Sequence, residues 1–330
     1  MAKTKRRRAL AALMAACLPI GMELPSRLQV VTSLPGQYRW IQGLVPLPDH
    51  TFLILDTGTH RSLIVSTKGE VIRQIGSIGQ EPGALQSPSA ISLDARDEIV
   101  VLDSDNYRVQ RFGRDGTFIS LFPLNYYSES FAVTSNGNIV VNSPPKGAVF
   151  SIYSSSGQLL RSGGAMLGES AGYPGHQSRQ SSLATMSRAI ICADRAGGFY
   201  VVYTFMPLVQ RYSAQGELLW QKRLSGPVID AAAKTFWHEP GAEPARFLKK
   251  VYGVQLPVVI SAAATLPNGR LLTAVTDGTL IELAETGEQL STVAAAENLP
   301  RAVLALAYQD SYLYLALSDE CFRTRDPIRF

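Results

Sequence analysis

Histidine, cysteine and glycine-rich patterns are the first places to look for chemistry in this chain. The four histidines are His50, His60, His176 and His238. They form no H-x-x-x-H pair, and the three cysteines form no Cys-x-x-Cys, so the local sequence gives no support for a zinc site. No G-x-x-x-x-G-K-[ST] loop is present to hold a phosphate group. We therefore expect neither a metal site nor a cofactor.

Polar side chains that recur at fixed spacing are better candidates. Asp56 lies 47 residues before Asp103, and Arg61 lies the same distance before Arg108. Each aspartate could accept backbone N–H bonds in a tight turn while its arginine packs between repeats. Alternatively, these side chains could form the rim of a ligand site. The full candidate rim is Asp56, His60, Arg61, Asp103, Asn106, Arg108, Trp237 and His238.

Three residues of that candidate rim also have a simpler, structural interpretation. His60 corresponds to Tyr107 of the next repeat, which favours a scaffold position. Trp237 and His238 lie together in a long connection, where an exposed polar turn before Pro240 is the simpler interpretation.

Short apolar runs must position these residues. Between residues 79 and 121 the runs SAISLD, EIVVLD, RVQRF and FISLF are separated by turn residues, the last turn being Arg-Asp-Gly. Runs this short that are rich in β-branched and aromatic residues indicate strands, and Asp-Gly favours a hairpin turn. Four antiparallel strands within about forty residues are typical of one propeller blade.

This unit resembles one NHL repeat. The resemblance lies in a G-x-x-G approach, a proline before the inner strand and an Asp-x-x-Asn-x-Arg-Val segment at the second turn. The matching residues are Gly76, Gly79, Pro88, Asp103, Asn106, Arg108 and Val109. The resemblance implies a β-propeller, usually of six blades. It does not imply one function, because such propellers include binding modules and several kinds of enzyme.

A glycine at the third turn, followed by a strand, extends the repeat through residues 40–295 as five units. The remaining C-terminal segment supplies the runs RAVLALAY and YLYLALS, with CFRTRD as a third strand. The apolar run at 27–33 is unassigned, and its pairing with the last strand would protect the edges of the sixth blade. We predict an all-β fold: a six-bladed propeller over 27–330, with four antiparallel strands per blade and the ring closed by that N-terminal strand.

Residues 1–16 predict an export leader, because five basic residues and no acid precede a short apolar run. Met14-Ala15-Ala16-Cys17 resembles a lipobox, so Cys17 is a candidate for lipidation and 17–26 for a tether. Plain secretion and an uncleaved tail on a cytosolic protein are the alternatives. The formal net charge is +4, and the leader's basic residues account for more than this excess. A nearly neutral propeller argues against nucleic acid as a partner.

The cysteines and the long connections complete the prediction. Cys192 and Cys321 could pair, but they fall on different predicted blades, which favours two buried free thiols. The connections at 162–188 and 225–257 are expected on the face that carries the second turns, with short helices at 231–238 and 245–252. That face surrounds the mouth of the central channel.

We expect a non-catalytic recognition or scaffold domain outside the cytoplasm, in membrane-anchored or secreted form. Its partner would be a protein, peptide or glycan bound at the channel mouth, with membrane contact through a lipid anchor at Cys17. The alternative is a metal-dependent hydrolase or lactonase. Resemblance to the propeller lactonases would imply calcium held by carboxylates and amides of inner strands. The runs SFAVTS, RAIICA, VVISAAAT and RAVLALAY contain no carboxylate, which disfavours that alternative.

Overall fold

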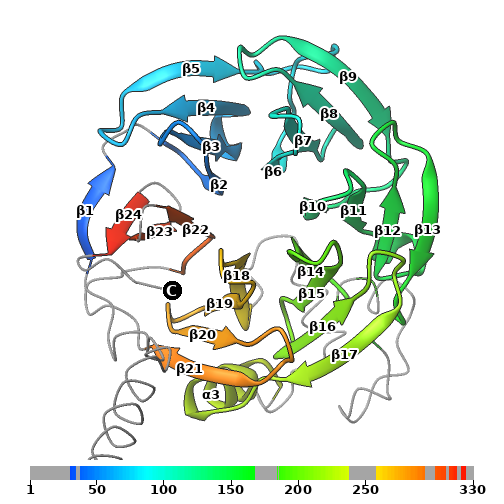
Figure 1. Ribbon diagram of the computed structural model, residues 1–330, viewed down its shortest axis with the longest axis vertical. Helices are drawn as coiled ribbons and strands as arrows, with labels where there is room; N and C mark the ends of the chain where they lie inside the picture. Colours follow the sequence, from blue (N-terminus) through cyan, green and yellow to red (C-terminus); the bar gives the residue numbers. More distant parts are fainter. Residues whose placement is uncertain are drawn as a thin grey trace, which may run out of the picture.

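The computed structural model describes residues 30–34, 38–167, 184, 186–237, 258–293, 302–309, 312–317 and 321–324. Their strands form six four-stranded sheets, and every paired strand is antiparallel to its neighbour. Figure 1 shows the sheets arranged in a ring around a central axis. The predicted all-β propeller of four-stranded antiparallel blades is confirmed.

Five of the sheets use four consecutive strands each. The first two are β2 (Ile41–Pro46), β3 (Phe52–Asp56), β4 (Arg61–Val65) and β5 (Val71–Ile75), then β6 (Pro88–Leu93), β7 (Ile99–Asp103), β8 (Arg108–Phe112) and β9 (Phe118–Pro123). The third is β10 (Phe131–Val133), β11 (Ile139–Asn142), β12 (Phe150–Tyr153) and β13 (Leu159–Gly163). The fourth is β14 (Ala189–Ala193), β15 (Phe199–Tyr203), β16 (Leu208–Tyr212) and β17 (Leu218–Arg223). The fifth is β18 (Ile260–Thr265), β19 (Leu271–Val275), β20 (Leu280–Leu283) and β21 (Gln289–Val293).

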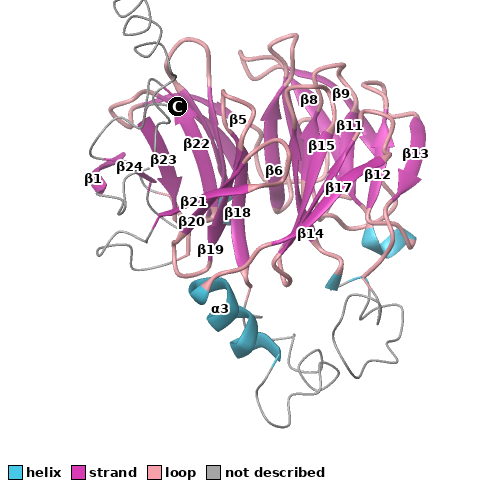
Figure 2. Ribbon diagram, turned by 60° about the horizontal axis from the view of Figure 1, so that its bottom comes forward, coloured by secondary structure: helices cyan, strands magenta, loops and turns pink. Residues whose placement is uncertain are grey.

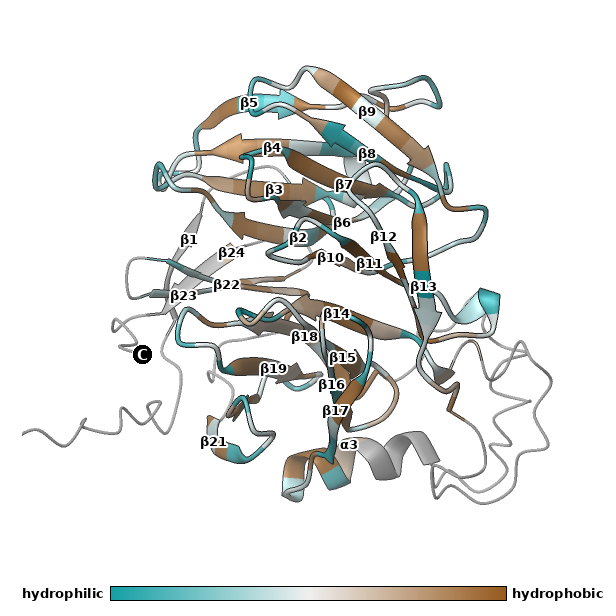
Figure 3. Ribbon diagram, turned by 45° about the vertical axis from the view of Figure 1, so that its right-hand side comes forward, coloured by the Kyte–Doolittle hydropathy of each residue, from teal (hydrophilic) through white to brown (hydrophobic). Residues whose placement is uncertain are grey.

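The strands of a sheet differ in burial according to their distance from the axis. Every residue of β7 and β8 is buried, whereas five of the six residues of β9 are exposed. The middle strands are continuous apolar runs because neighbouring sheets cover both of their faces. For example, Leu53 and Leu55 of β3 pack with Ile99 and Val101 of β7. The core therefore lies between sheets, and Figure 3 shows hydrophobic residues along the strands and hydrophilic residues in their connecting loops.

The recurrent third-turn glycine has two physical reasons. Gly116 and Gly157 adopt φ angles of 86° and 88°, a left-handed conformation that side chains rarely tolerate. A Cβ on Gly157 would also lie 2.4 Å from Phe122 of the preceding sheet. Each turn thus sits against its neighbouring sheet, and the sequence repeat reflects this close contact.

The sixth sheet joins the two ends of the chain. Its order is β1 (Val30–Leu34), β24 (Cys321–Thr324), β23 (Tyr312–Ala316) and β22 (Ala305–Gln309). Strand β1 pairs antiparallel with β24. The pairing predicted between the ends of the chain is therefore present, with β1 extending to Leu34, one residue beyond the predicted run, and residues 27–29 of that run lying outside the described residues.

Helical elements are few among the described residues. Helix α3 (Pro227–Trp237) begins earlier than the predicted 231–238, because proline is favoured in the first turn of a helix. Figure 2 shows α3 beyond the ends of β18 and β19. Short 3₁₀ turns follow β3 and β11, at η2 (Thr57–Thr59) and η3 (Pro144–Lys146). The helix predicted at 245–252 lies outside the described residues. Cys192 and Cys321 are both buried, and no disulfide joins them to each other, as expected.

Candidate functional site

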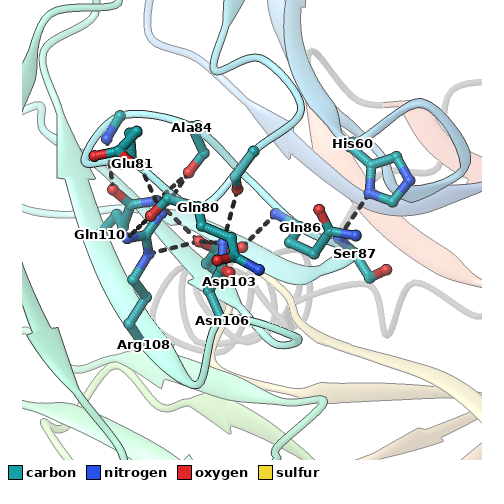
Figure 4. A network of polar contacts seen from close by, with 12 residues as sticks. His60, Gln80, Glu81, Ala84, Gln86, Ser87, Asp103, Asn106, Arg108 and Gln110 are labelled. Atoms are coloured by element: carbon teal, nitrogen blue, oxygen red, sulfur yellow. Dashed lines mark hydrogen bonds and ion pairs between the residues drawn. The ribbon is translucent and has the colours of Figure 1, made fainter.

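Asp103 is the centre of a dense polar network at the second turn of the β6–β9 sheet (Figure 4). Its Oδ1 accepts the backbone N–H of Gln86 at 2.6 Å. Its Oδ2 accepts bonds from Arg108 Nε at 2.7 Å, Asn106 Nδ2 at 2.8 Å and Gln110 Nε2 at 3.0 Å. The Asp103 carboxylate is fully buried, so all of its interactions are with the protein.

Arg108 uses the rest of its guanidinium on the loop before β6. Its Nη1 donates to the carbonyl of Gln80 at 2.7 Å, and its Nη2 donates to those of Glu81 and Ala84 at 2.9 and 2.8 Å. Asn106 also binds this loop. The network therefore fastens the approach loop to its own sheet, and it uses four of the five N–H groups of the arginine.

Asp56 has a similar role one sheet earlier. Its Oδ1 accepts the backbone N–H groups of Arg39 and Trp40 at 3.1 and 3.0 Å, and its Oδ2 accepts Thr59 Oγ1 at 2.7 Å. Arg61 donates to the same threonine and lies 4.0 Å from the aspartate. These contacts fix the chain just before β2.

His60 connects two sheets. It adopts a left-handed φ of 56°, and its Nδ1 accepts the backbone N–H of Ser87 at 2.8 Å. Tyr107, the corresponding residue of the next sheet, has a φ of 52°. Trp237 ends α3, but its side chain and the whole of His238 lie outside the described residues. The six candidates with described side chains thus lie at the ends of β3, β4, β7 and β8 or in the turns between them, where their contacts hold the scaffold together.

The cavity lies elsewhere, on the ring axis. It has a volume of about 1250 Å³ and is lined by inner strands and by loops of the second-turn face. None of the candidate rim side chains that the structure describes is part of its lining. The polar, aromatic and small residues of the lining include Trp40, Gln42, Gly43, Ser89, Ala90, Tyr127, Ser128, Glu129, Ser130, Asn142, Pro144, Pro145, Arg188, Thr204, Phe205, Ser261, Ala262, Ala263, Thr276 and Ala305.

The channel wall is made of small and apolar groups with few unused polar atoms. Ser130 Oγ accepts the backbone N–H of Ile191 at 2.9 Å, and Asn142 binds the N–H of Ala189 and the carbonyl of Val149. The other lining hydroxyls are similarly engaged: those of Ser89, Ser128, Thr204, Ser261 and Thr276. Such a wall favours apolar parts of a ligand over groups that require many new hydrogen bonds.

The mouth adds aromatic rings and one ion pair. Trp40 and Tyr127 are each 41% exposed. The Arg188 guanidinium forms an ion pair with Glu129 and lies 5.7 Å from the centre of the Phe205 ring. The side chains of Arg188 and Glu129 are 42% and 31% exposed, so solvent and a ligand can reach both.

Electrostatics at the mouth follow from partial burial. Burial raises the pKa of Tyr127 above its usual value, which keeps the phenol protonated as a hydrogen-bond donor to Glu129 at 3.1 Å. Burial lowers the pKa of Arg188 from its usual value, with the nearby Tyr127 acting in the opposite direction. An arginine remains charged near neutral pH in spite of such a shift.

The described residues form no recognisable metal site. In the part of the chain that the structure describes, no three His, Cys, Asp or Glu side chains converge as a metal site. Residues 168–172 read Gly-Glu-Ser-Ala-Gly, the spacing of a nucleophile elbow, but they lie outside the described residues. That elbow belongs to the strand-to-helix turn of an α/β sheet, which this propeller does not contain among its described elements.

Sequence reasoning missed the residues that form the mouth. Trp40, Tyr127, Glu129 and Arg188 come immediately before inner strands, whereas the repeated motifs drew attention to the second turns. Their only sequence signal is position, since each lies within a few residues before the first strand of a sheet. Among the described residues, no helix is long and apolar enough to cross a bilayer.

Comparisons with known proteins agree with this architecture. Residues 85–112 match the NHL repeat family. Protein brain tumor of Drosophila melanogaster is 28% identical over 102 residues, which cover 28% of this chain and 10% of that protein. The chain therefore matches only about a tenth of the length of that curated relative.

Solved structures resemble the whole ring. A streptogramin B lyase has a TM-score of 0.55 at 10% identity, covering 89% of this chain and 95% of the lyase. Virginiamycin B lyase from Staphylococcus aureus has a TM-score of 0.57 at 8% identity, covering 90% and 98%. A catalytically inactive variant of that lyase with quinupristin gives 0.57 at 9% identity, with the same coverage. At such low identity these likenesses show the fold alone. The chain is a β-propeller that carries an NHL repeat.

Proposed function

We propose that this protein is an exported recognition domain that binds a protein or peptide segment at the mouth of its central channel. The observation that carries the proposal is the cavity of about 1250 Å³, which combines an apolar wall, exposed aromatic rings and one accessible ion pair. Pockets of this composition are typical binding sites, with a few polar groups that orient the ligand. In this proposal the sixth sheet acts as a full blade and closes a six-bladed ring.

Binding is favoured over catalysis by the inventory of the described lining. It contains one carboxylate, Glu129, and one guanidinium, Arg188, and these two groups neutralise each other. General acid–base catalysis needs a group within reach of the substrate whose proton can move near neutral pH. A carboxylate held by an arginine and a phenol is poorly suited to that role.

A peptide is favoured over a glycan because of hydrogen bonding. A glycan presents many hydroxyl groups, whereas most hydroxyls of the channel wall are already bonded within the protein. Aromatic rings and apolar walls suit hydrophobic side chains, which gain from leaving water. The charged pair would bind backbone or terminal groups.

Location outside the cytoplasm, by lipid anchor or by secretion, is part of the proposal. It rests on the basic and apolar leader at 1–16 and on Cys17 in a lipobox-like sequence. In a Gram-negative host we expect processing near Cys17 and incorporation of radiolabelled fatty acid, which Cys17→Ala should abolish. An unprocessed, unlabelled cytosolic product would contradict export.

The binding function is tested by probing arrays of random dodecapeptides and of glycans with purified full-length protein. We expect peptide binding that falls in Trp40→Ala, because this change removes an exposed ring of the mouth while the backbone N–H bonded to Asp56 remains. Val71→Ala on the exposed outer strand β5 is the matched control. Binding to glycans alone, or to neither array, would overturn the peptide proposal.

A metal-dependent hydrolase or lactonase is the alternative that this proposal must exclude. Elemental analysis of the purified protein decides between them. Stoichiometric calcium or zinc, together with hydrolysis of lactone substrates that is lost on metal removal, would replace the binding function with an enzymatic one.

A further inference from the structure

Arg188 is fixed at the mouth by its backbone and by its aromatic neighbour. Thr204 donates to the Arg188 carbonyl through its backbone N–H at 3.1 Å and through its hydroxyl at 3.2 Å. The guanidinium lies over the ring of Phe205, with 5.7 Å from Cζ to the ring centre. Both neighbours also line the cavity. The cation is therefore held next to the opening of the channel.

The Glu129 carboxylate has fewer unused hydrogen-bonding positions than the Arg188 guanidinium. Glu129 accepts the Tyr127 hydroxyl at Oε1 and forms the ion pair with Arg188 through Oε2. A guanidinium has five N–H donors in a planar fork. Among the described residues, the polar contact of the Arg188 guanidinium is this ion pair. Arg188 can therefore bind a second carboxylate while Glu129 stays in place, because an arginine fork suits bidentate recognition.

Other charges near the opening are balanced between the two signs. Lys146 directly follows the lining residues Pro144 and Pro145, and its Nζ lies 5.7 Å from the centre of the Tyr126 ring. Asp105 is the exposed acid on the turn between β7 and β8. Two cations thus accompany Glu129 and Asp105, and within the described lining the positive charge comes from Arg188, while the amide of Gln42 is neutral.

Below the charged pair the cavity is apolar. Ala90, Ala262, Ala263 and Ala305 come from three inner strands, β6, β18 and β22, and leave room on the axis. A ligand that fills both parts must carry an apolar group close to a carboxylate. The terminal residue of a peptide has this chemistry when its side chain is hydrophobic.

We propose that the channel mouth captures the C-terminus of a peptide, with the terminal carboxylate on Arg188 and the last hydrophobic side chain in the channel. This inference rests on the proposed function, because it assumes that the ligand is a peptide. Glu129 and Tyr127 position the guanidinium. Trp40 packs beside the residues that precede the terminal one.

The test uses purified full-length protein and a fluorescein-labelled peptide Gly-Ser-Gly-Ala-Leu-Phe, measured by fluorescence anisotropy. The peptide with a free C-terminal acid should bind about ten-fold more tightly than its C-terminal amide, the size expected for one charge-assisted contact. Arg188→Gln should lower the affinity for the acid peptide to that for the amide peptide. Arg96→Gln, on an exposed arginine paired with Asp94 and Glu98, is the matched control and should change neither affinity.

Glu129→Gln separates this proposal from recognition of a cation. It removes the competing carboxylate, so the free acid should bind equally well or a few-fold more tightly. A large loss of acid binding in folded Glu129→Gln would overturn the proposal, as would equal affinity for acid and amide. The fold of each variant is checked by its melting curve.

A second probe distinguishes the source of the carboxylate. Dodecanoate has the same apolar and anionic parts without a peptide backbone. Binding of dodecanoate without binding of the acid peptide would contradict the peptide C-terminus. If the dodecapeptide array shows binding that depends on neither Arg188 nor a free terminus, the proposed function stands and only this inference fails; if it shows none, both fail.

Discussion

The second turn of the β6–β9 sheet and the channel mouth both contain an arginine paired with a carboxylate, but they differ in how many donors remain. Arg108 is bonded to Asp103 and to three backbone carbonyls. Arg188 is bonded to Glu129 and packs over an aromatic ring. The first pair is buried, and the second is open to solvent.

Unused donors and a neighbouring cavity separate a binding pair from a scaffold pair in a repeated fold. A repeated Asp–Arg pair attracts attention as a possible ligand rim, yet its polar atoms are consumed by the turn that it holds. A pair that occurs once, with donors to spare and an apolar cavity beside it, is the better candidate for binding. Removing a scaffold pair should therefore lower stability, and removing the mouth pair should lower affinity.

Ring closure should give the largest effect on the scaffold side. Protein that begins at residue 26 keeps β1, whereas protein that begins at residue 35 leaves β24 paired with β23 alone. We expect the shorter protein to unfold at a temperature lower by roughly 10 °C or more, because loss of the strand opens the ring and exposes sheet edges. Scanning calorimetry of both proteins measures this difference. Equal melting temperatures would show that β1 does not close the ring.

Asp103→Ala should have the next largest effect. It leaves the buried Arg108 without its carboxylate, a change that typically costs about 3–5 kcal/mol. Urea denaturation gives the free energy of unfolding, and Asp105→Ala on the exposed turn is the control. The fraction that remains folded should bind the acid peptide normally. If stability is unchanged while binding is lost, Asp103 and Arg108 belong to the binding site and not to the scaffold.

A smaller effect is expected from pH at Asp94. Burial alone would raise the pKa of Asp94, but hydrogen bonds from Arg111 and from the N–H groups of Glu98 and Arg96 outweigh it and hold the pKa below 3.8. A lowered folded-state pKa means that the stabilisation is present above the unfolded-state value and is lost as pH falls through the folded one. Asp94→Asn should flatten the decline in stability below about pH 4, measured by urea denaturation across pH. If the free energy of unfolding of Asp94→Asn falls as steeply below pH 4 as that of the unmodified protein, Asp94 is not the source of the decline.

Arg188→Gln should affect stability least. Partly exposed ion pairs contribute about 0–1 kcal/mol, so the free energy of unfolding should change by no more than that. Urea denaturation alongside Asp103→Ala makes the contrast direct. A loss as large as that of Asp103→Ala would place Arg188 in the scaffold and remove the distinction between the two regions.

Much of the fold could be predicted because the signals are local. Apolar runs such as EIVVLD are bounded by turn residues, and the third-turn glycines are required by positive φ and by contact with the neighbouring sheet. Even the pairing of β1 with β24 followed from counting strands. The sequence does not define the start of β1, since no turn residue marks where its pairing with β24 begins.

The site was not predictable in the same way. Glu129 and Arg188 belong to successive sheets and meet only because the loops before β10 and β14 converge on the axis. The long insertion before Arg188 hides its equivalence to Trp40, which also precedes an inner strand. No spacing rule connects such residues. The repeated aspartates, in contrast, were conspicuous in sequence because Asp56 and Asp103 recur at a fixed spacing, and each accepts backbone N–H groups of the segment before its own inner strand.

Photo-crosslinking can locate the bound peptide terminus on the protein. The acid peptide Gly-Ser-Gly-Ala-Leu-Phe is made with benzoylphenylalanine in place of its last residue, irradiated with full-length protein and mapped by mass spectrometry. We expect crosslinks to residues of the channel mouth such as Trp40, Tyr127 and Phe205, and unlabelled acid peptide should suppress them at about ten-fold lower concentration than its amide. Crosslinks on the exposed outer strands, for instance at Leu218 or Leu219 of β17, would contradict it.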